Sequence, residues 1–465
     1  MYPSGDIMRR IKKSKFLSKG EIEMKKLLIF LLLISLALPL MATGQKEQKG
    51  TKAGPITLKV MSTYNKASQG VDARVDAWYQ MQKEMKAAYP DVKFDFEYIP
   101  HDAYQDKIQI LAAANELPDL FELKGSWTKK FVSNNRVMPL NEIFDSDPAW
   151  AKSFKKGVFT NFTIDGKIYA ANVQGGGSTH VIFYNTNILA KAGYNTVPRT
   201  YEEFKKMIKA IRAIGYTPIS LGDKSNWVAE SCYLSTIGNR MTGVEWTNSI
   251  TNRTGASFTN PQFIKALGVL QELAKIGAFN PDMNSLEYTQ QRVPYYNGKA
   301  AMFVEGGWAV NHVIKNAKPD VLAATHLIDF PKIKGQIGPD NLNTGGTSGW
   351  GIAINSSVAN QPEKKKLAFE IIKRFVSMKN AIKLAEQGRI PSMKVTKFDT
   401  SRLKRLNKEY LAYMDKFIPA PTYDLVWDPA VIETLNSGLQ MLLIQKITPK
   451  ALAEKVEQQY KRAGK

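Results

Sequence analysis

Three short segments in the first quarter of the chain have the alternating apolar and polar pattern of β-strands. Residues 56–62 read "ITLKVMS", residues 92–99 read "VKFDFEYI", and "PDLFEL" at 118–123 is the third. Between them, apolar residues recur at helical spacing over 71–85 and again over 103–117. This strand–helix–strand–helix–strand order predicts parallel strands joined by right-handed crossovers, and therefore an α/β lobe.

A second unit begins around a glycine triplet. In "GKIYAANVQGGGSTHVIFYN", residues 166–185, the triplet separates two strand-like segments. Thr448 followed by Pro449 has the residue types of an N-cap and of the first helical position. Because 465 residues are too many for one compact core, two lobes are expected. Further helices are predicted at 200–213, 261–276, 363–387, 430–445 and 448–462.

The N-terminal region has the organisation of a secretory signal. Met24-Lys25-Lys26 is followed by the apolar run "LLIFLLLISLALPL", and "MATG" supplies small residues for cleavage after Gly44, or alternatively after Ala42. The run is shorter than the roughly 20 residues that span a bilayer, which argues against a membrane anchor. We therefore expect an upstream extension at 1–23, a signal peptide at 24–44 and a flexible tether at 45–54.

Cysteine content and charge refine the expected location. Cys232 is the only cysteine, so the sequence offers neither an internal disulfide nor a lipid-anchor cysteine beside the signal, and a periplasmic protein is expected. The net charge is +22; residues 1–44 hold eight Lys/Arg and three Asp/Glu, which leaves +17 for the remainder. This balance indicates a solvated lysine-rich surface, or else an acidic ligand or an anionic envelope surface. No dense basic cluster with nucleic-acid motif spacing is present, which argues against a nucleic-acid partner.

Sequence signatures of catalysis and nucleotide binding are missing. The chain has no G-x-x-x-x-G-K-[ST] loop, no G-x-G-x-x-G fingerprint, no G-x-S-x-G elbow and no H-E-x-x-H. The four histidines, at positions 101, 180, 312 and 326, are scattered without metal-ligand spacing. We therefore predict no enzyme activity, no cofactor and no metal, although paired carboxylates that meet in space stay open as a glycan-cleaving alternative.

Tryptophans at loop junctions are the most informative candidate binding residues. Trp78 has the apolar spacing of a core helix, whereas four others follow polar or glycine-rich loops. The flat face of an indole complements the apolar face of a pyranose ring, and glycine beside it lets a ligand approach the backbone. The pattern favours a carbohydrate-type cleft lined by Trp227, Trp308, Trp350 and Trp427.

Four stretches resemble the family 1 extracellular solute-binding proteins of bacterial ABC importers, of the maltodextrin-binding type. The stretch 165–211 resembles the family's crossing strand and following helix, and "YYNGKAAMFVEGGWAV" at 295–310 resembles its strand ending in a ligand-stacking tryptophan. Residues 345–377 resemble the return crossing, and 447–460 resemble the closing helix. The resemblance covers nearly the whole chain after the predicted signal.

The resemblance implies the two-lobed type II periplasmic binding protein fold. The ligand lies in a cleft between two α/β lobes, which are joined by crossing strands that act as a hinge. We expect an N-terminal lobe at 55–175 plus 322–345 and a C-terminal lobe at 176–321 plus 346–465. The glycine-containing segments "VQGGGST" and "NTGGTSG" are the candidate hinge strands.

The resemblance also assigns residues to the cleft. It gives Trp308 the role of a stacking platform, and places Tyr64 and Asn65 in the first strand–helix loop. The segment after "PDLF" departs from the family by lacking the usual aromatic residue, for which Trp127 is the candidate replacement. The full predicted ligand-binding set is Trp308, Trp227, Trp350, Trp427, Tyr64, Asn65, Glu122, Lys124, Ser126, Gln174, Glu305 and Arg389.

The expected function is therefore that of the substrate-binding component of an ABC transporter. The protein would capture a sugar or oligosaccharide between its lobes and deliver it, as a monomer, to a membrane permease with a separate ATPase. Three alternatives stay open: a binding protein for an anionic non-sugar solute such as a glycerol phosphate ester, which the basic balance suggests, a periplasmic glycan-active enzyme, and a receptor subunit that reports to a chemosensor.

Overall fold

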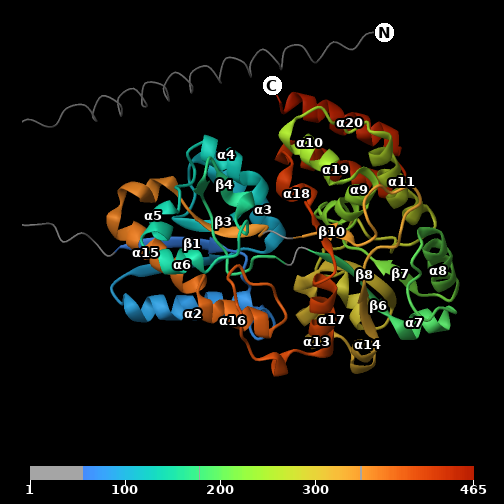
Figure 1. Cartoon of the computed structure of the whole chain (residues 1–465), viewed down its shortest axis with the longest axis horizontal. Helices are drawn as coiled ribbons and strands as arrows, with labels where there is room; N and C mark the ends of the chain where they lie inside the picture. Colours follow the sequence, from blue (N-terminus) through green and yellow to red (C-terminus); the bar gives the residue numbers. More distant parts are fainter. Residues whose placement is uncertain (1–55, 177–178, 346–347, 465) are drawn as a thin grey trace, which may run out of the picture. The chain divides into compact units, whose positions relative to one another are not determined.

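The structure is a computed structural model that describes residues 56–176, 179–345 and 348–464. The predicted extension, signal peptide and tether lie outside the described residues. The region from residue 56 onward forms two lobes, each with its own β-sheet and buried core (Figure 1). The prediction of two lobes is confirmed. Within the described residues, no helix is long and apolar enough to cross a membrane.

The first lobe is built on a four-stranded sheet of order β11-β3-β1-β2. The strands β1 (Thr57–Ser62), β2 (Lys93–Tyr98) and β3 (Leu120–Lys124) are parallel, as the alternating segments predict. The fourth strand, β11 (Trp350–Ile354), is antiparallel to β3. Because β1, β2 and β3 run in one direction, their carboxyl ends meet at a single edge of the sheet.

Helices cover both faces of this sheet. The longest, α2 (Ala73–Ala88), begins where the Asp72 side chain accepts a hydrogen bond from the Arg74 N–H, and it buries Trp78 and Met85. The other helices of the first lobe are α3 (His101–Ala114), α4 (Thr128–Ser133), α5 (Asn141–Asp145), α6 (Pro148–Lys152), α15 (Pro362–Phe375) and α16 (Met378–Glu386), and the 3-10 turns are η1 (Lys66–Ser68), η2 (Gly125–Trp127), η3 (Thr160–Phe162) and η6 (Ser356–Asn360).

The second lobe has a mixed sheet of order β7-β8-β6-β9. Its strands are β6 (His180–Asn185), β7 (Thr217–Ser220), β8 (Ala300–Gly306) and β9 (Thr325–Ile328). The strands β7 and β8 are parallel, and β6 runs antiparallel to both β8 and β9. Two short pairs complete the strands: β10 (Leu342–Thr344) with β12 (Ile418–Ala420) in this lobe, and β4 (Thr163–Ile164) with β5 (Lys167–Ile168) in the first.

Helices dominate the second lobe. Thr448 accepts a hydrogen bond from the Ala451 N–H at 3.2 Å, so the predicted N-cap of the last helix is confirmed. The helices are α7 (Thr186–Lys191), α8 (Tyr201–Ala213), α9 (Ser235–Thr242), α10 (Val244–Asn252), α11 (Pro261–Lys275), α12 (Arg292–Tyr296), α13 (Val310–Asn316), α14 (Pro319–Ala323), α17 (Arg405–Met414), α18 (Tyr423–Val426), α19 (Pro429–Leu443) and α20 (Pro449–Arg462), with the π-helix η4 (Ala229–Leu234) and the 3-10 turn η5 (Gly307–Ala309).

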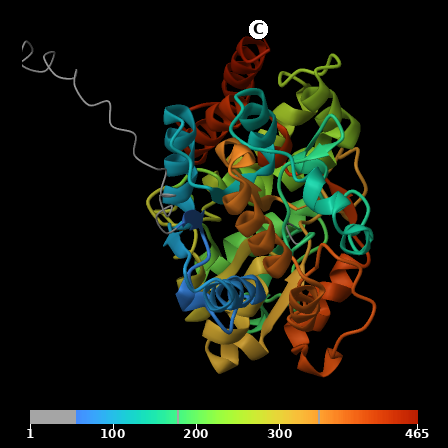
Figure 2. The same ribbon diagram turned by 90° about the vertical axis from the view of Figure 1, so that its left-hand side faces the viewer.

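The boundaries between the lobes differ from the sequence expectation. The segment 322–345, expected in the first lobe, contains β9, which pairs with β6 in the second sheet. Residues from Ile352 to Met393, expected in the second lobe, belong to the first core, because β11 pairs with β3 and both α15 and α16 pack on α2. Figures 1 and 2 show these orange helices beside the blue helix α2.

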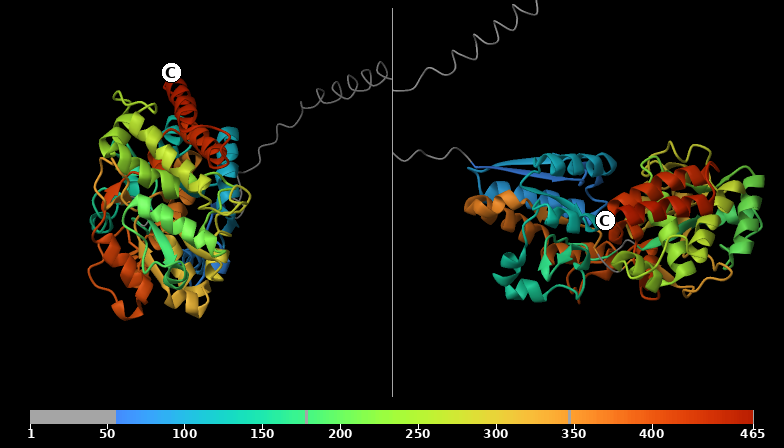
Figure 3. Two further views of the ribbon diagram at one scale, coloured as in Figure 1. Left: turned by 90° about the vertical axis from the view of Figure 1, so that its right-hand side faces the viewer. Right: turned by 90° about the horizontal axis from the view of Figure 1, so that it is seen from above.

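The described segments therefore alternate between the two lobes, with three crossings from one lobe to the other. The expected hinge segments 173–179 and 343–349 fall at two crossings, and their residues 177–178 and 346–347 lie outside the described residues. The third crossing follows α16 and includes the 3-10 turn η7 (Thr400–Arg402) before α17 begins. Seen from above, in the right panel of Figure 3, the two lobes lie side by side. The predicted single helix over 363–387 is two helices, because Ser377 caps the start of α16.

Candidate functional site

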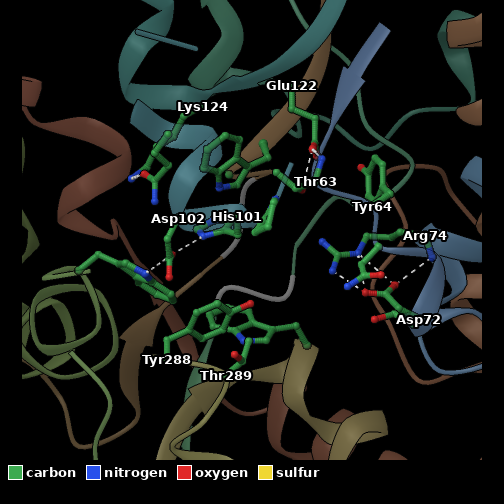
Figure 4. Close-up of a pocket in the computed structure, with 18 of the residues that line it drawn as sticks. Thr63, Tyr64, Asp72, Arg74, His101, Asp102, Glu122, Lys124, Tyr288 and Thr289 are labelled. Atoms are coloured by element: carbon green, nitrogen blue, oxygen red, sulfur yellow. Dashed lines mark hydrogen bonds and ion pairs between the residues drawn. The ribbon is translucent and has the colours of Figure 1, made fainter. Parts of the chain in front are cut away.

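A cleft with a volume of about 630 Å³ lies between the two lobes. This is within the 300–1,000 Å³ range of small-molecule sites. The first lobe contributes the ends of β1, β2 and β3, and the second lobe contributes the start of β6, the π-helix η4, the loop at 287–289 and η5. Figure 4 shows side chains from both sides directed toward this space.

Polar groups of the first lobe converge on the cleft because the parallel strands end there. Glu122, on β3, accepts hydrogen bonds of 2.6 Å from both the backbone N–H and the hydroxyl of Thr63, which follows β1. Tyr64 is the next residue, and its buried hydroxyl has no hydrogen-bond partner among the described residues. Burial and the neighbouring Glu122 raise the pKa of Tyr64, so it stays a neutral hydroxyl.

A charged network supports this wall beside Tyr64. Arg74 donates through Nε and Nη2 to Asp72, with a shortest distance of 2.5 Å. Burial by itself would raise the pKa of Asp72, but Arg74 and Arg389 outweigh burial and hold that pKa far below its usual range. Arg389 also donates to Gln174, a residue of the first crossing, at 2.5 Å. The network therefore ties the start of α2 to two chain crossings.

In the second lobe a buried ion pair orients Trp308. The Glu305 carboxylate is fully buried and receives two hydrogen bonds from Arg292, at 2.8 and 2.6 Å. Its second oxygen also accepts from the Trp308 Nε1–H at 2.7 Å. A Cβ at Gly306 would lie only 2.1 Å from the Trp308 ring, so this glycine is required for the ring to fold back over the strand end. The "EGGW" stretch thus holds an indole in a fixed position at the cleft.

A second group of rings packs together in the wall of the cleft. Trp227 and Tyr288 of the second lobe pack edge to face, with centroids 5.1 Å apart. His101, at the start of α3 in the first lobe, lies 5.7 Å from Trp227, 5.8 Å from Tyr288 and 5.3 Å from Trp350. These rings come from segments far apart in the sequence, and all four residues line the cleft.

Two polar contacts join the lobes across the cleft. The Lys124 ammonium lies 2.7 Å from the Asp424 carboxylate, and both side chains are only 8% exposed. The Trp227 Nε1–H donates to Asp102 at 3.2 Å. The described structure is therefore a closed arrangement of the two lobes, in which residues of each lobe bond directly to the other.

Buried polar atoms without partners mark where a ligand can bond. Among the described residues, His180 Nε2 and Asp424 Oδ1 line the cleft without a hydrogen-bond partner. Burial lowers the pKa of His180 to about 4, so its imidazole is neutral near pH 7. With the Tyr64 hydroxyl, these atoms provide donors and acceptors suited to hydroxyl groups, because a buried polar atom left unpaired is costly.

Most of the predicted binding residues line the cleft. Glu122 and Lys124 lie on its first-lobe side, and Trp308 and Trp227 on its second-lobe side. The structure places eight of the predicted residues on the wall: Trp308, Trp227, Trp350, Tyr64, Asn65, Glu122, Lys124 and Gln174. Their roles toward a ligand stay predictions.

Four predicted residues do not line the cleft. Trp427 is 2% exposed and stacks on Tyr423 with centroids 3.8 Å apart, because the chain turns its ring into the second-lobe core. Glu305 is engaged by Arg292 and Trp308, and Arg389 lies behind the wall against Asp72 and Gln174. Ser126 lies in η2, outside the cleft wall.

The candidate replacement in the first lobe, Trp127, also lies behind the wall. It is 6% exposed and packs edge to face on Trp350, with centroids 5.3 Å apart. Trp127 therefore supports a cleft ring without lining the cleft itself.

Sequence reasoning missed several wall residues. His101 and Asp102 follow β2 directly, so the rule that sites gather at the carboxyl ends of parallel strands could have found them. His180, Tyr288 and Asp424 carry no comparable local signal, because only tertiary structure brings them to the cleft. Among the described residues, no group of three or more His, Cys, Asp or Glu side chains is arranged to hold a metal ion.

Comparison with protein families gives a match to a model described as bacterial extracellular solute-binding protein, over residues 72–382. The chain is 22% identical to the melibiose/raffinose/stachyose-binding protein MelE of Bacillus subtilis over 449 residues, covering 93% of this chain and 96% of that protein. It is 22% identical to the arabinooligosaccharide-binding protein of Bacillus subtilis over 330 residues, covering 70% of this chain and 72% of that protein. With an uncharacterized ABC transporter extracellular-binding protein of Pyrococcus horikoshii it shares 24% identity, and the match spans 56% of that protein's length.

Among solved structures, a chitin oligosaccharide binding protein superposes with a TM-score of 0.79 at 25% identity, covering 88% of this chain and 99% of the other. A maltose-bound MalE3 of T. maritima superposes with a TM-score of 0.69 at 19% identity, covering 88% of this chain and 100% of the other. The predicted two-lobed type II periplasmic binding protein fold is confirmed.

Proposed function

Because the chain belongs to the family of bacterial extracellular solute-binding proteins, we propose that it captures a sugar or oligosaccharide between its lobes and delivers it to an ABC permease. The observation that carries this proposal is the composition of the cleft. Four flat rings, Trp227, Tyr288, Trp308 and Trp350, line a space that also contains unpartnered buried polar atoms. Rings that stack on pyranose faces and polar atoms that bond hydroxyl groups are the two contacts a sugar needs.

The relatives and structural neighbours support this ligand class. The names of the Bacillus subtilis relatives state binding of melibiose, raffinose, stachyose and arabinooligosaccharides, and that of the structural neighbour states chitin oligosaccharides. All three are named as binding proteins, so we propose that this chain binds its sugar without chemical turnover. Incubation with labelled oligosaccharides checks this, because a binding protein returns them intact.

Export, a monomeric state and partnership with a permease and a separate ATPase belong to the same proposal. The support is the signal-like segment 24–44 and the family itself, whose members are described as extracellular. Expression of the full chain, followed by N-terminal sequencing of the exported product, tests the cleavage site. Light scattering of that product tests the monomer.

The direct test is a ligand screen on residues 45–465. Thermal unfolding is measured with mono- and oligosaccharides, since a ligand that binds the native state raises the melting temperature by mass action. Each positive sugar is then titrated calorimetrically against the parent protein and Trp308→Ala. Loss of the Trp308 ring is expected to weaken binding at least thirtyfold, the effect of a binding hot spot worth about 2 kcal/mol.

The matched control is Trp150→Phe. Trp150 packs on Phe144 and Phe154 in the first lobe, outside the cleft, and its Nε1–H donates to the Val376 carbonyl. This variant is expected to keep full affinity. A screen in which no sugar binds contradicts the proposal, and equal affinities in Trp308→Ala and the parent contradict the role of the Trp308 ring.

A further inference from the structure

The strongly basic chain has a cleft that offers little free positive charge. Three cationic side chains line the cleft, and each is paired with a carboxylate: Arg74 with Asp72 at 2.5 Å, Lys124 with Asp424 at 2.7 Å, and Arg292 with Glu305 at 2.6 Å. In each pair the carboxylate side chain is less than a tenth exposed. An incoming anion must therefore compete with a buried internal partner for every cation it could use.

Two further carboxylates line the cleft without a Lys or Arg partner. Among the described residues, Asp102 has no Lys or Arg within ion-pair distance, and neither has Glu122. Asp102 accepts from Trp227 and lies 3.1 Å from the His101 ring. Burial by itself would raise the pKa of Asp102, but the contact with His101 lowers it, so the group is ionised near neutral pH. Glu122 is 3% exposed, and its carboxylate accepts from the backbone N–H and the hydroxyl of Thr63.

Helix ends and the two buried histidines, His180 and His312, do not reverse this excess of carboxylates in the cleft. Helices α2 and α3 begin at the cleft, where their N-termini could attract an anion, but Asp72 caps α2 and Asp102 lies in the first turn of α3. Burial lowers the pKa of His180 to about 4 and that of His312 to about 3, so both are neutral near pH 7. Among the described residues, three Lys or Arg side chains line the cleft together with five carboxylates, which are Asp72, Asp102, Glu122, Glu287 and Asp424.

We propose that this cleft selects its ligand by charge, admitting sugars that carry no negative group and excluding uronates and phosphate esters, with Asp102 and Glu122 as the residues that set the selection. This rests on the proposed sugar-binding function and specifies its ligand class. The excess of basic residues then lies outside the cleft and serves another purpose, such as attraction to an anionic envelope surface.

The test uses matched probes that differ in charge. Residues 45–465 are titrated calorimetrically with cellobiose and cellobiouronic acid, with galactobiose and digalacturonate, and with any neutral sugar found in the screen together with its uronate counterpart. Glycerol 3-phosphate serves as an anionic non-sugar probe. The neutral member of each binding pair is expected to bind at least tenfold more tightly than the acidic member.

Two variants assign the selection to its residues. Asp102→Asn removes one charge and keeps an oxygen acceptor for Trp227, and Glu122→Gln keeps an acceptor for Thr63. Each variant is expected to reduce the ratio of the affinity for the neutral sugar to the affinity for the acidic sugar at least threefold. The control Asp95→Asn removes the same charge from an exposed position on β2, outside the cleft. It is expected to leave the ratio of neutral to acidic affinity unchanged.

The outcomes separate this inference from the proposed function. An acidic sugar that binds as tightly as its neutral partner overturns charge selection and leaves sugar binding standing. If Asp95→Asn reduces the ratio of neutral to acidic affinity as much as the cleft variants do, Asp102 and Glu122 are not the residues that set the charge selection. Binding of glycerol 3-phosphate with no sugar bound overturns both proposals and identifies an anionic non-sugar solute as the ligand.

Discussion

The two walls of the cleft differ in their chemistry and in the way they are held. The first-lobe wall places carboxylates and the Tyr64 hydroxyl at the ends of parallel strands, where the Thr63 backbone N–H fixes Glu122. The second-lobe wall presents rings from loops and short turns, and the central ring, Trp308, is oriented by a buried ion pair. One wall takes its geometry from the sheet, and the other takes it from side chains packed behind it.

Because of this difference, a change to the support of the cleft wall should reduce the stability of the second lobe more than that of the first. Glu305 is fully buried and reaches three partners, so disturbing it affects both the core of the second lobe and the platform at the cleft. The equivalent support in the first lobe, Asp72, has Arg74 at 2.5 Å and Arg389 at 3.8 Å, so the loss of one partner leaves another. The second wall should therefore be the more fragile.

The largest expected effect comes from breaking the support of the second wall. Arg292→Ala leaves the Glu305 carboxylate buried without a cation, which is expected to lower the free energy of unfolding by about 3–5 kcal/mol. Arg74→Ala is the counterpart in the first wall, and a smaller loss is expected because Arg74 is 27% exposed and Arg389 is still near Asp72. Urea unfolding of both variants measures the difference; equal losses would mean that the two walls are supported alike.

The next effect is a dependence of stability on pH that arises in the second wall. His180 has a folded pKa of about 4 against about 6.5 when unfolded, so between these values the unfolded chain binds more protons. The contribution of neutral His180 to the free energy of unfolding is fully present above pH 6.5. It declines as the pH falls toward 4, and the total loss is about 3 kcal/mol. Unfolding measured from pH 7.5 to 4 is expected to show a shallower decline in His180→Asn than in the parent.

The control for this prediction is His326→Asn. The His326 side chain is 39% exposed and lies outside the cleft, so a change in the pH profile that appears in His180→Asn and not in His326→Asn assigns the decline to the buried histidine. If the free energy of unfolding of His180→Asn falls with pH as steeply as that of the parent, the decline arises from groups other than His180.

A moderate effect is expected where the two walls meet. The Lys124–Asp424 pair joins the lobes, so removing either charge should favour an open arrangement. In a double-mutant cycle with Lys124→Met and Asp424→Asn, a coupling of about 1–2 kcal/mol is expected in the affinity for a sugar found in the screen. X-ray scattering should give a larger radius of gyration for each single variant. Lys205→Met breaks a pair with Glu272 inside the second lobe and should leave the radius unchanged.

The smallest effect comes from one hydroxyl of the first wall. Tyr64→Phe removes a buried hydroxyl that has no partner among the described residues, so the free energy of unfolding should change by less than about 0.5 kcal/mol. A sugar that bonds this hydroxyl should lose about 1 kcal/mol of binding, or roughly fivefold in affinity. Calorimetric titration and urea unfolding of the same variant check both values; a loss of stability with unchanged affinity would assign Tyr64 to the core alone.

Local patterns predicted much of the fold and the general nature of the site. The alternating segments gave the parallel order of β1, β2 and β3, and the Thr448-Pro449 pair gave the start of α20. Tryptophan beside glycine at 306–308 pointed to a ring displayed at a strand end. These signals are readable because strand alternation, caps and close packing of a ring on glycine depend on neighbours in the sequence.

The assignment of later segments to lobes was not predictable in this way. Residues 350–393 return to the first lobe because β11 pairs with the free edge of β3, and a local pattern does not say which of two sheets a strand will join. The same holds for β9, which adds to β6. Trp427 follows a loop-like segment, yet its ring lies in a core formed by residues such as Phe258 and Tyr423.

By itself, the sequence determined which segments form strands and helices and which rings were available for a sugar. Tertiary structure alone decided that Glu305 orients a ring instead of bonding a ligand, and that Lys124 meets Asp424 across the cleft. It also decided that a basic chain surrounds a cleft with more carboxylates than cations. The physical reason is that secondary structure follows short-range periodicity, whereas the charge and shape of a binding site depend on contacts between residues hundreds of positions apart.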